Sequence, residues 1–305
     1  MPDLRFGVTY SERDDFTDLV RYTKKVEELG FDSLWVTENI SSDAPALECF
    51  IALSFMAANT SRLTIGTSVL LLPLRNPVLV AQTVNSLDIL SGGRLVLGVG
   101  VGDVNSEHEA YGGVISERGS RCDESLELMK RLWTESPVTF HGRHYTLNDY
   151  VLLPRPVQKP HPPIWVGGHA ESVLRRAGQW ADGYIPVGMS PERCVGLFEK
   201  VESYARSYGR SPSSIARTFH GYLCLSDSRE ESARITSRVL TKRYGPTEVS
   251  ADIPALFGTP EECRKTLREY IEIGVTHFVF NMTCQPEEAI SQAEVVAKEV
   301  LPQLS

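Results

Sequence analysis

The amino-acid sequence predicts an eight-stranded β/α (TIM) barrel, a single α/β domain over residues 1–305, with short insertions after the fourth and seventh strands. Segments of strand composition alternate with segments of helical periodicity from one end of the chain to the other. This alternation implies a parallel sheet, and eight repeats suit a closed barrel better than an open doubly wound sheet. No linker-like stretch divides the chain, which fits one barrel domain in length.

Four strand–helix units account for the first half of the chain. Apolar residues three and four positions apart favour amphipathic helices packed on a sheet. Gly30 is a stop signal for the first helix, and Pro77 suits the first turn of the third, where an N–H has no helical partner. The expected strands are 4–10, 31–40, 62–73 and 92–103, and the expected helices are 15–29, 44–61, 77–90 and 120–134.

Two segments interrupt this rhythm and are the expected insertions. Residues 136–163 offer two short strands and then a proline-rich end, which no helix interior tolerates. Residues 227–258 are expected to form a helix followed by a loop with Gly and Pro.

Strand–helix units also account for the rest of the chain. Thr259 is the expected N-cap of a helix over 259–274, with Pro after it and Glu in the first turn. The fifth strand, a Gly-Gly turn, a helix and the sixth strand fall within 163–188. The remaining elements are a helix over 191–208, strands over 217–225 and 276–282, and a final helix after residue 288.

The charge of the chain restricts its partners. The formal net charge of −8 and a pI near 5.5 argue against a nucleic-acid or anionic-membrane surface, because both need clustered Lys and Arg. No apolar run approaches the roughly 18 residues of a membrane span. The first residues show no signal-peptide pattern, so a cytoplasmic location is expected.

The sequence predicts no metal site. The six cysteines are widely spaced, the nearest two being Cys263 and Cys284, so no CxxC pair exists and they are expected to be small buried hydrophobes. His141 and His144 have a helical spacing, but their segment has strand composition, and residues three apart on a strand face opposite sides.

The ends of the expected strands are the place to look for a site, because in such a barrel they point to the rim where ligands bind. These ends contain no Ser-His-Asp arrangement, no carboxylate cluster and no evident Schiff-base lysine. We therefore expect the reactivity to come from a cofactor. The strand ends are 37–40, 72–76, 100–105, 167–170, 188–189, 225–226 and 281–282.

Four stretches give the sequence a resemblance to the bacterial luciferase-like family of flavin- and deazaflavin-dependent oxidoreductases. They are "GFDSLWVTEN", "LTIGTSVLLLPLRNPVLVAQTVNSLDILSGGRLVLGVGVG", "ERGSRCDESLELMKRLW" and "PPIWVGGHAESVLRRAGQWADGY", and the resemblance extends over essentially the whole chain. It implies a barrel of the same type and a cofactor at its rim.

The turn formed by Gly167, Gly168, His169 and Ala170 is the candidate site for the cofactor's phosphate. Two glycines let the backbone come close, and the helix that follows offers free N–H groups of positive dipole character. The same glycines also fit a plain strand-to-helix turn.

The resemblance also implies a site for the cofactor's ring. Ser68–Val69 is similar to the place where deazaflavin users of the family carry a non-proline cis peptide under the ring, with Val69 on one ring face and Ser68 near the pyrimidine edge. A buried serine bonded to its own strand is the alternative. Asn105 is expected to offer its amide to the polar ring edge. The glycines at 98, 100 and 102 are expected to leave room for a flat ring.

One departure from the family concerns the reacting proton. Glu38 is followed by Asn39, where many members carry a His that is the proposed acid/base of several deazaflavin enzymes. Asn cannot titrate, so Glu38, His108 or His169 takes that role, or no protein acid is needed, or activity has been lost. His108 also fits a solvated helix residue.

The leading functional hypothesis is hydride transfer between the reduced deazaflavin coenzyme F-420 (F420) and a small organic substrate, which the two insertions would hold. A two-component FMN-dependent monooxygenase is the alternative, and a non-catalytic flavin-binding protein is the second. The expected partners are a separate flavin or deazaflavin reductase and, by analogy with the family, a second copy in a homodimer. No nucleic acid or membrane partner is expected.

Overall fold

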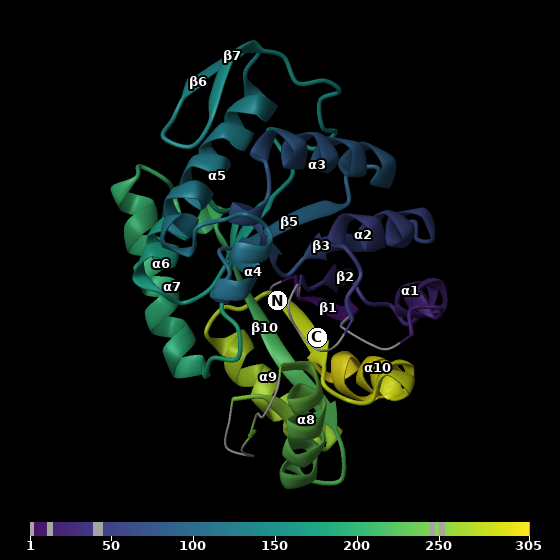
Figure 1. The fold of residues 1–305 in the computed structure, drawn as a ribbon. Helices are drawn as coiled ribbons and strands as arrows, with labels where there is room; N and C mark the ends of the chain where they lie inside the picture. Colours follow the sequence, from purple (N-terminus) through teal and green to yellow (C-terminus); the bar gives the residue numbers. More distant parts are fainter. Residues whose placement is uncertain (1–2, 11–14, 39–44, 245–247, 250–253, 305) are drawn as a thin grey trace.

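The computed structural model describes residues 3–10, 15–38, 45–244, 248–249 and 254–304, and these form a closed parallel barrel surrounded by helices (Figure 1). Each strand pairs with the next in the order given, and the last pairs with the first, which confirms the expected eight-stranded β/α barrel. The barrel strands are β1 (Arg5–Tyr10), β2 (Ser33–Val36), β3 (Thr64–Thr67), β5 (Leu95–Gly100), β8 (Ile164–Gly167), β9 (Gly183–Ile185), β10 (Ala216–Leu225) and β12 (His277–Met282). A two-residue strand, β4 (Leu70–Leu71), continues beyond β3 and pairs with β5.

Helices cover the outside of the barrel between successive strands (Figure 1). The α-helices are α1 (Leu19–Glu28), α2 (Cys49–Ala58), α3 (Pro77–Ser91), α4 (Asn105–Ala110), α5 (Arg118–Thr134), α6 (Glu171–Trp180), α7 (Pro191–Ser207), α8 (Arg229–Tyr244), α9 (Pro260–Glu272) and α10 (Ala289–Val295). A π-helical turn, Val296–Val300, follows α10. Short 3-10 turns are Leu72–Leu74, Ile115–Glu117, Pro212–Ser214, Pro286–Glu288 and Leu301–Gln303.

The helix boundaries follow the local signals in the sequence. Asn76 caps α3 by accepting the backbone N–H of Val78 at 2.9 Å, and Pro77 occupies the first turn as expected. Thr259 and Glu262 form a reciprocal capping box at the start of α9, which confirms the predicted N-cap. Gly30 follows α1 with φ +88°, a conformation that glycine adopts without a steric penalty.

Both predicted insertions are present. The first contains the antiparallel hairpin of β6 (Val138–His141) and β7 (Thr146–Tyr150), and Asp88 of α3 anchors the segment beyond it by accepting the Val157 N–H at 2.7 Å. The second contains α8 and also β11 (Leu256–Gly258), which pairs in parallel with β10. The prediction of a plain loop after α8 was wrong there, because a three-residue strand is too short to show a period of two.

An apolar layer fills the inside of the barrel. The indole rings of Trp35 and Trp165 stack with their centroids 4.8 Å apart, and Val96, Ile185 and Val279 complete the layer. All six cysteines are buried, as expected, and none of them forms a disulfide bond. Within the described ranges, the helices are too short or too polar to cross a membrane. The layer forms a solid base above which the carboxyl ends of the strands can hold a ligand.

Candidate functional site

A cavity of about 580 Å³ lies at the carboxyl ends of the barrel strands, where the sequence predicts the site. Its lining comes from the ends of β2, β3, β5, β8 and β12, from the middle of β10, and from the segments that follow the strands. The lining residues are Thr37, Glu38, Ser68, Val69, Leu71, Gly100, Val101, Gly102, Asp103, Arg118, Gly167, Gly168, His169, Ala170, Val173, Val187, His220, Tyr222 and Asn281. Its size suits a coenzyme ring or another small organic molecule.

The Ser68–Val69 peptide, between β3 and β4, is cis, as expected. The Val69 side chain lies between two strands that carry glycine beside it: a Cβ added to Gly100 would lie 2.6 Å from Val69 Cγ2, and one added to Gly167 would lie 2.9 Å from Val69 Cγ1. A Cβ added to Gly98 would meet the Thr67 carbonyl oxygen at 2.0 Å. These glycines therefore admit Val69 and the Thr67 backbone. Gly100 and Gly102 also line the cavity, and the room they leave for a flat ring stays a prediction.

The hydroxyl of Ser68 contacts a side chain from the opposite part of the barrel. Its Oγ lies 2.8 Å from Nδ1 of His220 on β10, so this serine is not bonded through its side chain to its own strand. His220 is buried, and this burial lowers its pKa to about 4. The imidazole is therefore neutral at neutral pH and reaches the cavity floor.

The turn after β8 has the geometry of an anion site. Gly168 has φ +122°, Ala170 is the N-cap of α6, and all four residues from Gly167 to Ala170 line the cavity. The first N–H groups of α6 have no helical partner and carry positive dipole character. Arg118, at the start of α5, is the one Lys or Arg among the described residues that line the cavity.

Glu38 lies at the cavity wall with both carboxylate oxygens occupied. Oε1 is paired with the Arg75 guanidinium, and Oε2 accepts the Leu71 backbone N–H at 2.5 Å. Arg75 also contacts Glu48 at 2.9 Å. These contacts tie the end of β2 to the chain just after the cis peptide, so they favour a positioning role for Glu38 over the proton transfer considered for it.

The other residues predicted for the site are dispersed. Asn39 lies outside the described residues, and His169 is exposed at the rim. Asn105 is exposed and donates its amide to Glu109 at 2.6 Å, four residues along α4, so it does not line the cavity. His108 does not line it either. That histidine is buried, with Nε2 3.1 Å from the Val101 carbonyl oxygen, which contradicts the alternative of a solvated helix residue.

Sequence reasoning did not single out Arg118, His220 or Tyr222, and it named Asn281 as a strand end without giving it a role. His220 and Tyr222 lie inside β10 rather than after it, and Asn281 pairs with Tyr222 in the register of β12 with β10. Polar residues two apart within an apolar strand were the available signal, because alternate residues of a barrel strand face its interior.

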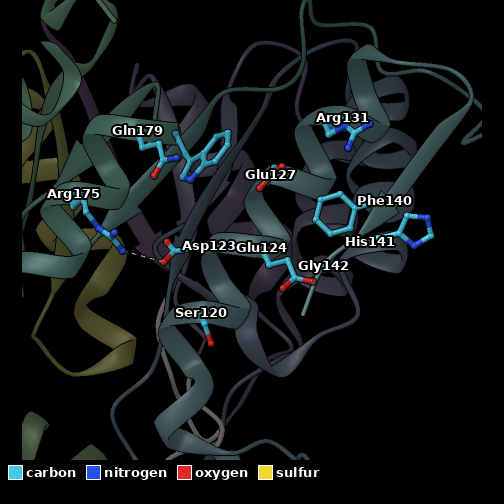
Figure 2. Close-up of a pocket in the computed structure, with 11 residues that line it drawn as sticks. Ser120, Asp123, Glu124, Glu127, Arg131, Phe140, His141, Gly142, Arg175 and Gln179 are labelled. Carbon is cyan, nitrogen blue, oxygen red and sulfur yellow. Dashed lines mark hydrogen bonds and ion pairs between the residues drawn. The ribbon is translucent and has the colours of Figure 1, made fainter. Parts of the chain in front are cut away.

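A second cavity, of about 470 Å³, lies outside the barrel between α5, α6 and the hairpin of the first insertion (Figure 2). Several of its charged groups have partners within the protein. Glu124 accepts the backbone N–H groups of Arg143 and His144, in the hairpin, at 3.0 and 2.9 Å. Asp123 contacts Arg175 at 3.4 Å. The contacts of Glu124 hold the hairpin against α5. Among the residues that the structure describes, no cluster of three or more His, Cys, Asp or Glu could bind a metal ion.

The comparisons with known proteins agree with this geometry. The chain is similar to proteins named F420-dependent glucose-6-phosphate dehydrogenase, from Kineococcus radiotolerans (29% identity over 88% of each chain) and from Intrasporangium calvum (30% identity over 86% of this chain and 87% of the relative). Its fold is similar to that of an F420-dependent secondary alcohol dehydrogenase solved with an F420–acetone adduct, with a TM-score of 0.86, 22% identity and 99% of each chain covered.

The family model described as luciferase-like monooxygenase matches residues 3–277, nearly the whole of the barrel. The cis peptide at Ser68–Val69 and the glycine turn before α6 lie within this range. The chain therefore belongs to the luciferase-like monooxygenase family.

Proposed function

We propose that this protein is an oxidoreductase that uses F420 for hydride transfer to or from a small organic alcohol or carbonyl compound. The observation that carries the proposal is the rim cavity, which joins the glycine turn before α6 to a floor that includes Val69. The names of the two F420-dependent relatives support the choice of coenzyme.

The residues present fit a coenzyme with a flat ring and a phosphate tail. The turn from Gly167 to Ala170 and the N-terminus of α6 would hold the phosphate, and Arg118 would add positive charge. A Cβ on Gly168 would meet Val173 at 3.3 Å, and its φ of +122° disfavours any other residue. A bulkier turn would not bring the backbone to the cavity.

The floor of the cavity would hold the ring. Val69 offers an apolar surface to one face of the ring, and Ser68, His220 and Asn281 offer polar groups to its edge. When bound, F420 gives or accepts a hydride at its ring C5. The apolar layer below keeps water from reaching the floor through the barrel. Glu38 and Arg75 hold the wall beside Val69 in place.

The test is an absorbance titration of the purified protein with F420 and, separately, with FMN. We expect F420 to bind, and glucose 6-phosphate or propan-2-ol, as probes, to change the absorbance of the bound coenzyme. Binding of FMN alone with oxygen-dependent turnover would favour the monooxygenase alternative. Binding with no turnover would favour a non-catalytic flavin-binding protein, and no binding of either coenzyme would refute the proposal.

We further propose that the protein forms a homodimer through α2 and α3, which are neighbours on the barrel surface (Figure 1). Both helices expose large apolar side chains: Ile51 and Phe55 on α2 are 59% and 53% exposed, and Leu79 and Leu90 on α3 are 62% and 79% exposed. Such a surface typically marks an interaction site. A separate reductase that supplies reduced coenzyme, and a cytoplasmic location, stay predictions.

A further inference from the structure

We propose that His220 presents an Nε2–H hydrogen-bond donor to the cavity and that its partner is a ring carbonyl oxygen of the bound coenzyme. The inference rests on the proposed function only in taking a flavin-type ring as the occupant. Deazaflavin and flavin rings share this carbonyl-bearing edge, so the choice between F420 and FMN does not enter.

His220 forms part of the floor of the cavity. In the parallel register of β10 with β12, His220 is the partner of Val279, which belongs to the apolar layer. Paired residues of neighbouring barrel strands face the same side, so the imidazole points into the barrel and lies just above that layer. It is only 3% exposed, and it lines the cavity.

The backbone around His220 is held on both sides. Its N–H donates to the Pro186 carbonyl oxygen at 3.0 Å, and its carbonyl oxygen accepts the Gly188 N–H at 3.0 Å. These two bonds attach the middle of β10 to the chain that follows β9. The imidazole therefore starts from a fixed backbone position, which suits a group that has to meet a ligand atom within hydrogen-bond distance.

Ser68 determines which ring nitrogen carries the proton. The Ser68 side chain is buried, and Nδ1 of His220 is its partner among the described residues, at 2.8 Å. A buried hydroxyl that donates to Nδ1 satisfies its own hydrogen, and a neutral imidazole then has its single N–H at Nε2. Nε2 has no protein partner in the described part of the chain, so this N–H is free for a ligand.

The surroundings keep the ring uncharged. Burial lowers the pKa of His220 to about 4, and no carboxylate, Lys or Arg faces the ring from the described parts of β3, β9, β10 and β12. The interior-facing side chains of these strands at the level of His220, or two residues from it along a strand, are Ser68, Ile185, Thr218, Tyr222, Val279 and Asn281. A neutral N–H in such a site binds an oxygen on which negative charge accumulates, without giving up its proton.

Nuclear magnetic resonance of the imidazole nitrogens tests the tautomer in the protein without coenzyme. The signals of His220 are assigned by their loss in His220→Gln. We expect a proton on Nε2 and a lone pair on Nδ1 from about pH 5 to about pH 8, and a mixture of tautomers in Ser68→Ala. A proton on Nδ1 in the unmutated protein would overturn the proposal.

Coenzyme titration tests the partner, with F420 and FMN as probes. His220→Leu removes the donor and should raise the Kd of whichever coenzyme binds by about tenfold, whereas His220→Gln keeps an N–H near the same place and should change it by about threefold or less. His161→Gln is the matched control, because His161 is also buried but bonds the Pro162 carbonyl oxygen outside the cavity. Its Kd should equal that of the unmutated protein.

The outcomes separate this inference from the proposed function. Coenzyme binding that is unaffected by His220→Leu, in a variant with native circular dichroism, would overturn the inference and leave the proposed function intact. Binding of neither coenzyme by the unmutated protein would overturn both. A loss of affinity in His220→Leu that His220→Gln restores would establish the donor.

Discussion

The hydroxyl of Tyr184 donates a hydrogen bond to the carbonyl oxygen of Gly168, with 2.7 Å between the two oxygens. Tyr184 lies in β9, and Gly168 lies in the turn between β8 and α6. The bond therefore braces, from the neighbouring strand, the turn that is proposed to receive the coenzyme's phosphate. Burial raises the pKa of Tyr184, so the hydroxyl keeps its proton and remains a donor.

Removing this brace should loosen the turn. We expect Tyr184→Phe to lower the free energy of unfolding by about 1 kcal/mol and to raise the coenzyme Kd by about threefold. Tyr270→Phe is the matched control, because the hydroxyl of Tyr270 donates to the Met189 carbonyl oxygen at the same distance of 2.7 Å but away from the turn. Urea unfolding and coenzyme titration give the two quantities. Equal coenzyme affinities in the two variants would contradict a role of the brace in binding.

A carboxylate in the turn should repel the phosphate. Gly168→Asp should raise the coenzyme Kd roughly 100-fold, because it adds a negative charge where an anion is proposed to bind. Gly168→Ala separates charge from backbone conformation, since it brings only the strain of φ +122° and the contact with Val173. Its Kd should rise much less than that of the Asp variant. An unchanged Kd in Gly168→Asp would rule out the turn as the phosphate site.

Glu38→Gln should weaken the wall of the cavity. Loss of the buried carboxylate leaves Arg75 without one partner, so we expect the free energy of unfolding to fall by about 2 kcal/mol. Turnover should fall while the pH–rate profile keeps its shape, because Glu38 holds Leu71 rather than moving a proton. Glu48→Gln, at the exposed end of the same ion pairs, should change stability by about 0.5 kcal/mol or less. If Glu38→Gln removed one limb of the pH–rate profile, proton transfer would be assigned to Glu38.

The contact between Val69 and Gly100 should be visible in a double-mutant cycle. Gly100→Ala places a methyl group 2.6 Å from Val69 Cγ2 and should lower the free energy of unfolding by about 1 to 3 kcal/mol. Adding Val69→Ala should recover part of that loss by making room for the methyl group. Chemical denaturation of the four proteins gives the coupling energy. Strictly additive effects would show that the two side chains do not compete for one space.

Charges on α2 and α3 should separate the proposed dimer. We expect Phe55→Glu combined with Leu90→Glu to change the mass measured by light scattering from about twice 33.9 kDa to that of one chain. Leu153→Glu is the control, because Leu153 is 64% exposed but lies in the first insertion. A monomeric unmutated protein, or a dimer that survives the double substitution, would refute this interface.

Local signals in the sequence were sufficient for the barrel and for part of the site. Pro77 and Thr259 marked helix starts because capping depends on a few adjacent residues. The Gly167–Ala170 turn was found from its two glycines between a strand and a helix, whereas the Ser68–Val69 cis peptide was expected from the family resemblance. Both lie at the rim because parallel strands end together.

The remainder of the site depends on contacts between distant segments. Ser68 and His220 are 152 positions apart, and they meet because the barrel closes and sets the register of β10. Asn105 was expected near the cofactor from the family resemblance, and His108 was a candidate to replace the missing family histidine. The conformation of the loop instead turns Asn105 toward Glu109 and His108 toward Val101. No spacing rule encodes such a loop.

The stacked indoles of Trp35 and Trp165 have a consequence for the sequence of binding events. They block the axis of the barrel directly beneath the cavity floor, so a molecule bound on the floor can leave only through the rim above it. When a second molecule lies over the first, the deeper one is trapped until the upper one departs. Kinetics should therefore be ordered, with the coenzyme arriving before the substrate and leaving after the product.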